Sequence, residues 1–220
     1  MDNKINLIID FDSTFIKLET IEVLADFSLS NKKNKVQILN KIKHITNKAM
    51  IGDIPFSEAL EQRIQLINPT TSHINKTIEF LKSQISDSFL KNKNFFQSYN
   101  KNCFIVSGGF KEIIIPLVNE FNILEKNIFA NTFIKNKNNL YIDKNNPLSK
   151  NNGKNIVVKN ISGNNIIVGD GYTDYEVKKD GNAKKFIQFT ENINRKSLNN
   201  KADLICNDFK KIISYINNDI

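Results

Sequence analysis

Three short apolar runs, each followed at once by acidic or small residues, constrain the fold of this chain most. Ile5 to Phe11 reads INLIIDF, and CFIV at Cys103 and NIIV at Asn165 follow later. Their apolar positions are continuous rather than alternating, which is typical of parallel strands buried on both faces. The runs end in DFDST, SGGF and GDGYTD. The pattern predicts a parallel sheet with polar groups at the carboxyl ends of its strands.

Helical patterns lie between these strands. Apolar residues recur at helical spacing over Phe110–Phe121, over Gly153–Ile161 and in a closing helix at Asp208–Ile216. Two further apolar runs, Lys185–Phe189 and Asp203–Cys206, extend the predicted sheet. Strands that alternate with helices favour an α/β fold with a doubly wound parallel sheet.

Two segments break the alternation. Phe15 to about Phe89 has only helical periodicity and is too long for a crossover, which predicts a small α-helical cap inserted after the first strand. Phe129–Asp143 reads as a β-hairpin that turns at NKNN. We therefore expect an α/β core from residues 1–14 and 90–220 and a helical cap insertion at 15–89.

Composition narrows the class of protein. The chain has 220 residues, 40% of them hydrophobic, which is enough for one well-buried core with a small inserted lobe. The first apolar run is too short for a signal peptide, and no later stretch approaches a membrane span. Cys103 and Cys206 have no metal-type spacing and are expected to be reduced, buried thiols. A cytoplasmic protein without a membrane partner is expected, and the oligomeric state stays open.

The formal net charge of +8 raises nucleic acid as a partner. Arg63 and Arg195 are the only arginines, whereas readout of bases and phosphates favours arginine forks. The lysines are scattered among asparagines rather than gathered on one helix face. A solvated surface is the preferred interpretation, so no nucleic-acid partner is expected.

The polar groups at the strand ends predict one site, because ligands of open α/β sheets bind outside the carboxyl ends of the strands. Several carboxylates at one point repel each other unless a cation is present, and an oxygen-only ligand set suits Mg²⁺. Backbone N–H groups of SGGF and a lysine that opens a helix add an anion pocket. A metal cluster beside an anion pocket is what phosphoryl transfer requires. The site would comprise Asp10, Asp12, Ser107, Gly108, Lys154, Asp170 and Asp174.

These motifs, in this order, resemble those of the haloacid-dehalogenase superfamily of phosphatases. ETIEVLA after the first motif and AMIGDIPFSEALEQRIQLI in the helical segment narrow the resemblance to its phosphoserine phosphatase family. The similarity runs from Leu7 to about Phe209. It implies hydrolysis of O-phospho-L-serine, a small phosphomonoester, in serine biosynthesis.

The resemblance also implies roles for the acidic residues. Asp10 would be the nucleophile that forms an aspartyl-phosphate. Asp12 would protonate the leaving oxygen and then activate water. Mg²⁺ would be held by the Asp10 carboxylate, the Asp12 main-chain carbonyl and Asp170, with Asp174 in support.

For the substrate, the resemblance implies that Ser107, Gly108 and Lys154 hold the phosphoryl oxygens. Glu19 would meet the ammonium, and Arg63 would clamp the carboxylate with a bidentate fork. Substrate contact is further implied for Thr173, which stands where some family members have asparagine.

Each assignment has a plainer alternative. The first two aspartates could be helix-capping residues, SGGF a strand-to-helix turn, and Glu19 and Arg63 ordinary helix residues. Lys150 or Lys159 could replace Lys154. The function also has alternatives: a phosphatase or phosphotransferase acting on another small phosphomonoester, or a basic module that binds nucleic acid.

Overall fold

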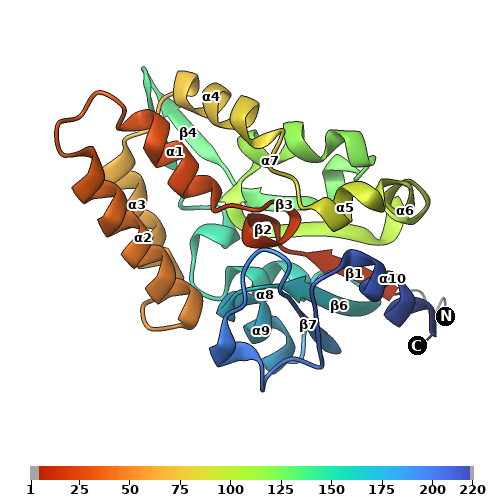
Figure 1. Cartoon of the computed structure of the whole chain (residues 1–220). Coiled ribbons are helices and arrows are strands. Elements are labelled where there is room, and N and C mark those ends of the chain that lie inside the picture. The colour runs from red at the N-terminus through yellow and green to blue at the C-terminus, as the bar shows by residue number, and fades with distance from the viewer. Residues whose placement is uncertain (1–4, 219–220) are drawn as a thin grey trace.

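The computed structural model describes residues 5–218 and is built around one six-stranded parallel sheet (Figure 1). The strand order β3-β2-β1-β6-β7-β8 places β1 in the interior, between β2 and β6. The predicted doubly wound α/β fold is confirmed. The strands are β1 (Ile5–Ile9), β2 (Cys103–Phe110), β3 (Ile128–Asn131), β6 (Asn164–Gly169), β7 (Lys185–Phe189) and β8 (Leu204–Cys206).

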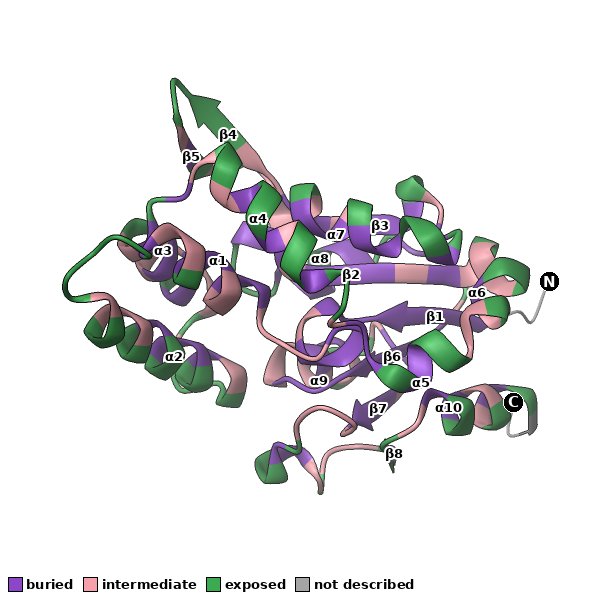
Figure 2. Ribbon diagram, turned by 45° about the horizontal axis from the view of Figure 1, so that its top comes forward, coloured by how far each residue is buried: buried purple, intermediate pink, exposed green. Residues whose placement is uncertain are grey.

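Helices cover both faces of β1, which explains its continuous apolar run. Leu7 and Ile9 point to one face and pack in the cluster that includes residues of α5, α6, α7 and α10. Ile8 points to the other face, against α8 and α9. Figure 2 shows β1 buried along its length. These helices are α5 (Asp87–Lys91), α6 (Lys93–Tyr99), α7 (Lys111–Val118), α8 (Gly153–Val158), α9 (Tyr172–Lys179) and α10 (Phe209–Asn218).

Four further helices lie between β1 and α5. They are α1 (Thr20–Ser28), α2 (Lys35–Ile51), α3 (Phe56–Ile67) and α4 (Thr71–Leu81), and we call Thr20–Leu81 the helical lobe. Figure 1 shows α1, α2 and α3 to one side of the sheet, whereas α4 packs against α7. The division at residues 15–89 stays a prediction, and residues 1–4 and 219–220 of the expected core lie outside the described range.

The two segments that connect the lobe to the core run side by side. Ile16 and Ile85 form an antiparallel bridge, and the N–H of Lys17 donates to the carbonyl oxygen of Gln84 at 2.8 Å. The side-chain amide of Asn192, in the loop after β7, donates to both segments where they run side by side, which we call the crossing of the lobe connections. Its Nδ2 lies 3.2 Å from the carbonyl oxygens of Ser13, Thr14 and Ile16, and 2.7 Å from Ser86 Oγ.

The predicted hairpin is wrong over its first residues. Phe129–Asn131 belongs to β3, which pairs with β2 in the main sheet, and the antiparallel hairpin consists of β4 (Phe133–Asn136) and β5 (Asn139–Ile142). A short apolar run has the same appearance in either setting, so periodicity alone did not separate them. The turn lies at NKNN as expected, between Asn136 and Asn139.

Candidate active site

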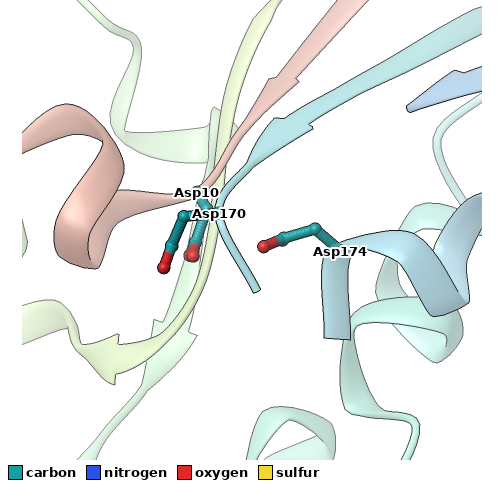
Figure 3. Close-up of side chains that lie close together, drawn as sticks. All are labelled: Asp10, Asp170 and Asp174. Carbon is teal, nitrogen blue, oxygen red and sulfur yellow. The ribbon is translucent and has the colours of Figure 1, made fainter. Parts of the chain in front are cut away.

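Three carboxylates meet at the carboxyl edge of the sheet. Asp10 follows β1, Asp170 follows β6, and Asp174 lies in the first turn of α9. Each offers an oxygen within 4.8 Å of the others, and all three are buried. They converge because β1 and β6 are paired neighbours, with the N–H of Asp10 donating to the carbonyl oxygen of Val168 at 2.9 Å. Figure 3 shows Asp174 pointing toward the other two.

Two basic side chains bind this cluster directly. Lys154 Nζ lies 2.8 Å from Asp10 Oδ1 and 2.6 Å from Asp174 Oδ1. Arg195 Nε lies 2.7 Å from Asp170 Oδ2. Burial opposes the charged form of Lys154, but the two carboxylates prevail and raise its pKa. Lys154 is therefore a fixed cation between the strand end and α9.

Two carboxyls of the cluster have raised pKa values despite these basic neighbours. Burial raises the pKa of Asp170 to about 7, although Arg195 opposes the shift. Burial and the charge of Asp10 raise the pKa of Asp174 to about 8, against Lys154. Raised carboxyl pKa values mean that the negative charge is under-compensated. Three buried oxygen donors of this kind are compatible with a metal site.

Asp12 lies near Asp10, and the two residues line one pocket between the core and the helical lobe. Its Oδ1 accepts a hydrogen bond from the N–H of Thr20, the first residue of α1, at 2.7 Å. Burial, followed by the nearby charge of Glu19, raises its pKa well above the usual range. A buried carboxyl with a raised pKa holds its proton more firmly, which suits it to donate that proton to a leaving group.

The end of β2 forms the wall opposite the cluster. Gly108 and Gly109 line the pocket, and Ser107 is fully buried beneath them, with its Oγ accepting from the N–H of Gly109 at 2.9 Å. A Cβ atom at Gly108 would lie 2.5 Å from the ring of Phe56. A side chain at this position would have to displace the ring of Phe56, which α3 brings close to the backbone.

Glu19 and Arg63 line the lobe side of the same pocket. Glu19 Oε1 accepts from Ser13 Oγ at 2.7 Å and lies 3.4 Å from an Arg195 nitrogen. Arg63 is only 3% exposed; its Nε donates to the carbonyl oxygen of Ala59 at 3.0 Å. A second guanidinium nitrogen donates to Thr46 Oγ1 at 3.1 Å, which leaves part of the donor fork for a ligand.

The remaining pocket walls are mainly apolar. Thr173 contributes a hydroxyl-bearing side chain near the start of α9. Lys150 also lines the pocket, whereas Lys154 is the lysine in contact with the carboxylates. The apolar wall consists of Ile21, Met50, Phe56, Leu60, Phe110 and Leu148.

Sequence reasoning missed two residues of the loop after β7. Arg195 contacts Asp170 and Glu19, and Asn192 binds the crossing of the lobe connections. Arg195 could have been found, because it is one of only two arginines in a lysine-rich chain. Asn192 had no such signal among the many asparagines of the sequence.

Comparison with known proteins shows the same architecture and related sequences. No protein-family model matches the chain. Phosphoserine phosphatase of Bos taurus is 29% identical over 211 residues, which cover 93% of this chain and 89% of that protein. The crystal structure of a phosphoserine phosphohydrolase-like protein from Francisella tularensis subsp. tularensis SCHU S4 is 31% identical. It superposes with a TM-score of 0.86 over 97% of this chain and 100% of that one.

The chain belongs to the phosphoserine phosphatase family of the haloacid-dehalogenase superfamily.

The fold of this family extends to more distant members. A structure of the phospho-aspartyl intermediate analogue of phosphoserine phosphatase shares 23% identity and a TM-score of 0.78 over 98% of this chain. The family resemblance inferred from the sequence motifs is thus confirmed.

Among the helices of residues 5–218, none combines the length and apolar character that a membrane span needs.

Proposed function

We propose that this member of the phosphoserine phosphatase family hydrolyses O-phospho-L-serine to L-serine and phosphate with Mg²⁺, in serine biosynthesis. One observation carries the proposal. Glu19 and Arg63, of opposite charge, line the same pocket as Asp10 and Asp12. A phosphorylated amino acid presents an ammonium and a carboxylate to such a pair while its phosphoryl group faces the aspartates.

In the first step of the proposed mechanism, a carboxylate oxygen of Asp10 attacks phosphorus. The bond between phosphorus and the serine oxygen breaks, and Asp12 transfers its proton to that leaving oxygen. The raised pKa of Asp12 supports this role, because burial favours its protonated form.

In the second step, Asp12 accepts a proton from a water molecule as the water oxygen attacks phosphorus. The bond from Asp10 to phosphorus breaks, which releases phosphate and regenerates the carboxylate. Lys154 and the N–H groups beside Ser107 and Gly108 would hold the phosphoryl oxygens in both steps. Thr173 would contact the substrate from the start of α9.

The donor set supports Mg²⁺ as the cation. Asp10 and Asp170 offer buried carboxylate oxygens, Asp12 would add its main-chain carbonyl, and Asp174 lies close enough to support them. Oxygen-only ligands suit this hard cation. When bound, it would neutralise charge on the transferring phosphoryl group.

The remaining expectations belong to the same proposal. The partner would be a small phosphomonoester rather than nucleic acid. A cytoplasmic location stays a prediction, and one relative, from Arabidopsis thaliana, is a chloroplastic phosphoserine phosphatase that is 29% identical over 93% of this chain.

Phosphate release from a panel of phosphomonoesters, with and without Mg²⁺, tests the function. We expect turnover of phosphoserine to exceed that of phosphomonoesters lacking either the amino or the carboxylate group, because such substrates lose the contact with Glu19 or with Arg63. Equal turnover across the panel would favour a general phosphatase. Transfer of the phosphoryl group to an added alcohol, in place of water, would indicate a phosphotransferase.

A further inference from the structure

The pocket lies between the core and the helical lobe, so the placement of the lobe against the core sets the separation of its two ends. Asp10 is 5% exposed and Arg63 is 3% exposed. The chain enters and leaves the lobe at two adjacent backbone segments, and the lobe also packs on the core, with α4 against α7 and α2 against α9. Contacts between the lobe and the core therefore decide how firmly the lobe is held over the pocket.

The first turn of α3 is the part of this helix that lies against the core. The ring of Phe56 approaches Gly108, and a Cβ atom at Gly52 would lie 3.0 Å from the ring of Tyr172. These are apolar contacts. The polar contact nearby comes from Asn151, whose Oδ1 accepts from both the N–H of Ser57 at 3.0 Å and its hydroxyl at 2.9 Å.

Helix α3 has no N-cap of its own. Pro55 precedes it, and no side chain in that position accepts a hydrogen bond from the first turn. A normal N-cap side chain accepts from the second or third N–H of the helix, and Ser57 is the second residue of α3. Asn151 makes this bond from the core, in the short loop before α8, the helix that carries Lys154. The helix is therefore capped only while lobe and core are together.

We propose that Asn151 is a positioning residue for substrate recognition, because it caps α3 across the gap between core and lobe and so holds Arg63 over the pocket. Arg63 lies on α3. The consequence for catalysis rests on the proposed function, since it concerns the amino-acid end of the substrate. Loss of the N-cap makes the placement of α3 against the core less favourable, and it changes no group that reacts.

The kinetic test uses Asn151→Ala and Asn151→Asp in the full chain with Mg²⁺. Asn151→Ala should raise KM for phosphoserine about 5-fold, the change typical of losing one N-cap, with kcat not lowered. Asn151→Asp keeps an acceptor oxygen and adds a favourable charge at the helix N-terminus, so it should retain the parent KM. p-Nitrophenyl phosphate, which has no carboxylate for Arg63, should be affected much less.

Lys144→Ala is the matched control. Lys144 also joins the core to α3, with Nζ 2.8 Å from Glu61 Oε1. Both contacts are exposed, but the Lys144 contact is a surface ion pair that caps no helix, so it should contribute little. Equal losses in Asn151→Ala and Asn151→Asp would overturn the proposal. So would an unchanged KM in Asn151→Ala, or equal effects on both substrates.

Hydrogen exchange separates this proposal from the proposed function. The amide of Ser57 should exchange faster in Asn151→Ala than in the parent, and at the parent rate in Asn151→Asp. If the parent did not hydrolyse phosphoserine, the proposed function would fail, yet the exchange rates would still decide whether Asn151 caps α3. Unchanged exchange in Asn151→Ala would overturn the capping itself.

Discussion

The two ends of the pocket are built in different ways. At the core end, Lys154 and Arg195 bind carboxylates at 2.6–2.8 Å, and the acidic groups follow strands of one sheet. At the lobe end, Arg63 is held by neutral partners, Thr46 Oγ1 and the carbonyl oxygen of Ala59. The core end is thus assembled at the edge of the sheet, by strand ends and the helices and loop beside them, whereas the lobe end depends on how four helices are placed.

This difference separates chemistry from recognition. Groups fixed by the sheet face phosphorus, which every phosphomonoester has. Groups on the lobe face the leaving group, which differs between substrates. Changes at the core end should therefore affect all substrates alike, and changes at the lobe end should discriminate between them.

The largest effect is expected for Asp10→Asn. The variant keeps the shape of the side chain but lacks the nucleophilic carboxylate, so kcat should fall by about 10⁴-fold or more for phosphoserine and for p-nitrophenyl phosphate alike. Phosphate release measures the loss, and a thermal melt checks that the fold persists. Activity within about tenfold of the parent, a barrier change of only ~1.4 kcal/mol, would contradict the covalent mechanism.

Removal of the metal should also affect both substrates. Dialysis against EDTA should abolish turnover, and Mg²⁺ should restore it, because without the metal ion the negative charge of the carboxylates and the transferring phosphoryl group would be under-compensated. Full activity after chelation would contradict the metal role of Asp170. It would also contradict the view that the core end of the pocket supplies the chemistry for every substrate.

The same cation should bind less well in acid. Burial raises the pKa of Asp170 to about 7 and that of Asp174 to about 8, so both carboxyls take up protons as pH falls through these values. Protons and the metal compete for the same oxygens. The Mg²⁺ concentration that gives half-maximal activity should rise as pH is lowered from about 8 to 6, and a constant value would show that neither carboxyl changes protonation on binding.

Arg63→Ala should separate the two ends. Loss of a charged hydrogen bond costs about 1.5–3 kcal/mol, so kcat/KM for phosphoserine should fall roughly 10- to 150-fold. Hydrolysis of p-nitrophenyl phosphate should change much less. Arg63→Lys should recover only part of the loss, since an ammonium keeps the charge but lacks the fork. Equal losses on both substrates would mean that Arg63 supports the fold or the phosphate pocket.

The smallest effect is expected for Thr46→Val. Valine keeps the shape but removes the hydroxyl that accepts a hydrogen bond from Arg63 at 3.1 Å. The net worth of such a bond is about 0.5–1.5 kcal/mol, so kcat/KM for phosphoserine should fall roughly 2- to 10-fold. Steady-state kinetics with both substrates measures it, and an effect on p-nitrophenyl phosphate of the same size would place Thr46 outside recognition.

The core end was the easier part to predict from sequence. Asp10 and Asp170 each follow a buried apolar run, and the carboxyl ends of parallel strands share one edge of a sheet. Their convergence therefore follows from two local patterns. The fold class follows for the same reason, although β3 was assigned to the hairpin because its few apolar residues have no period of their own.

Other parts of the site depend on contacts between distant segments. Arg195 and Asn192 lie in an irregular loop, where no periodicity relates them to Asp170 or to Ile16. Asn151 lies in a Lys/Asn-rich stretch that reads as a solvated loop, and its role depends on the position of α3. Such positions are set by packing across the molecule, which local residue patterns do not encode.

The crossing of the two lobe connections has a consequence for how such proteins diversify. Ile16 and Ile85 are bridged neighbours, so the chain leaves the core and returns to it at nearly the same point. The strand order of the sheet does not involve anything between them. A lineage can lengthen, shorten or replace the inserted helices without rearranging the sheet that carries the nucleophile. New substrate preferences can then arise through changes in the inserted helices, while the sheet keeps the groups that react with phosphorus.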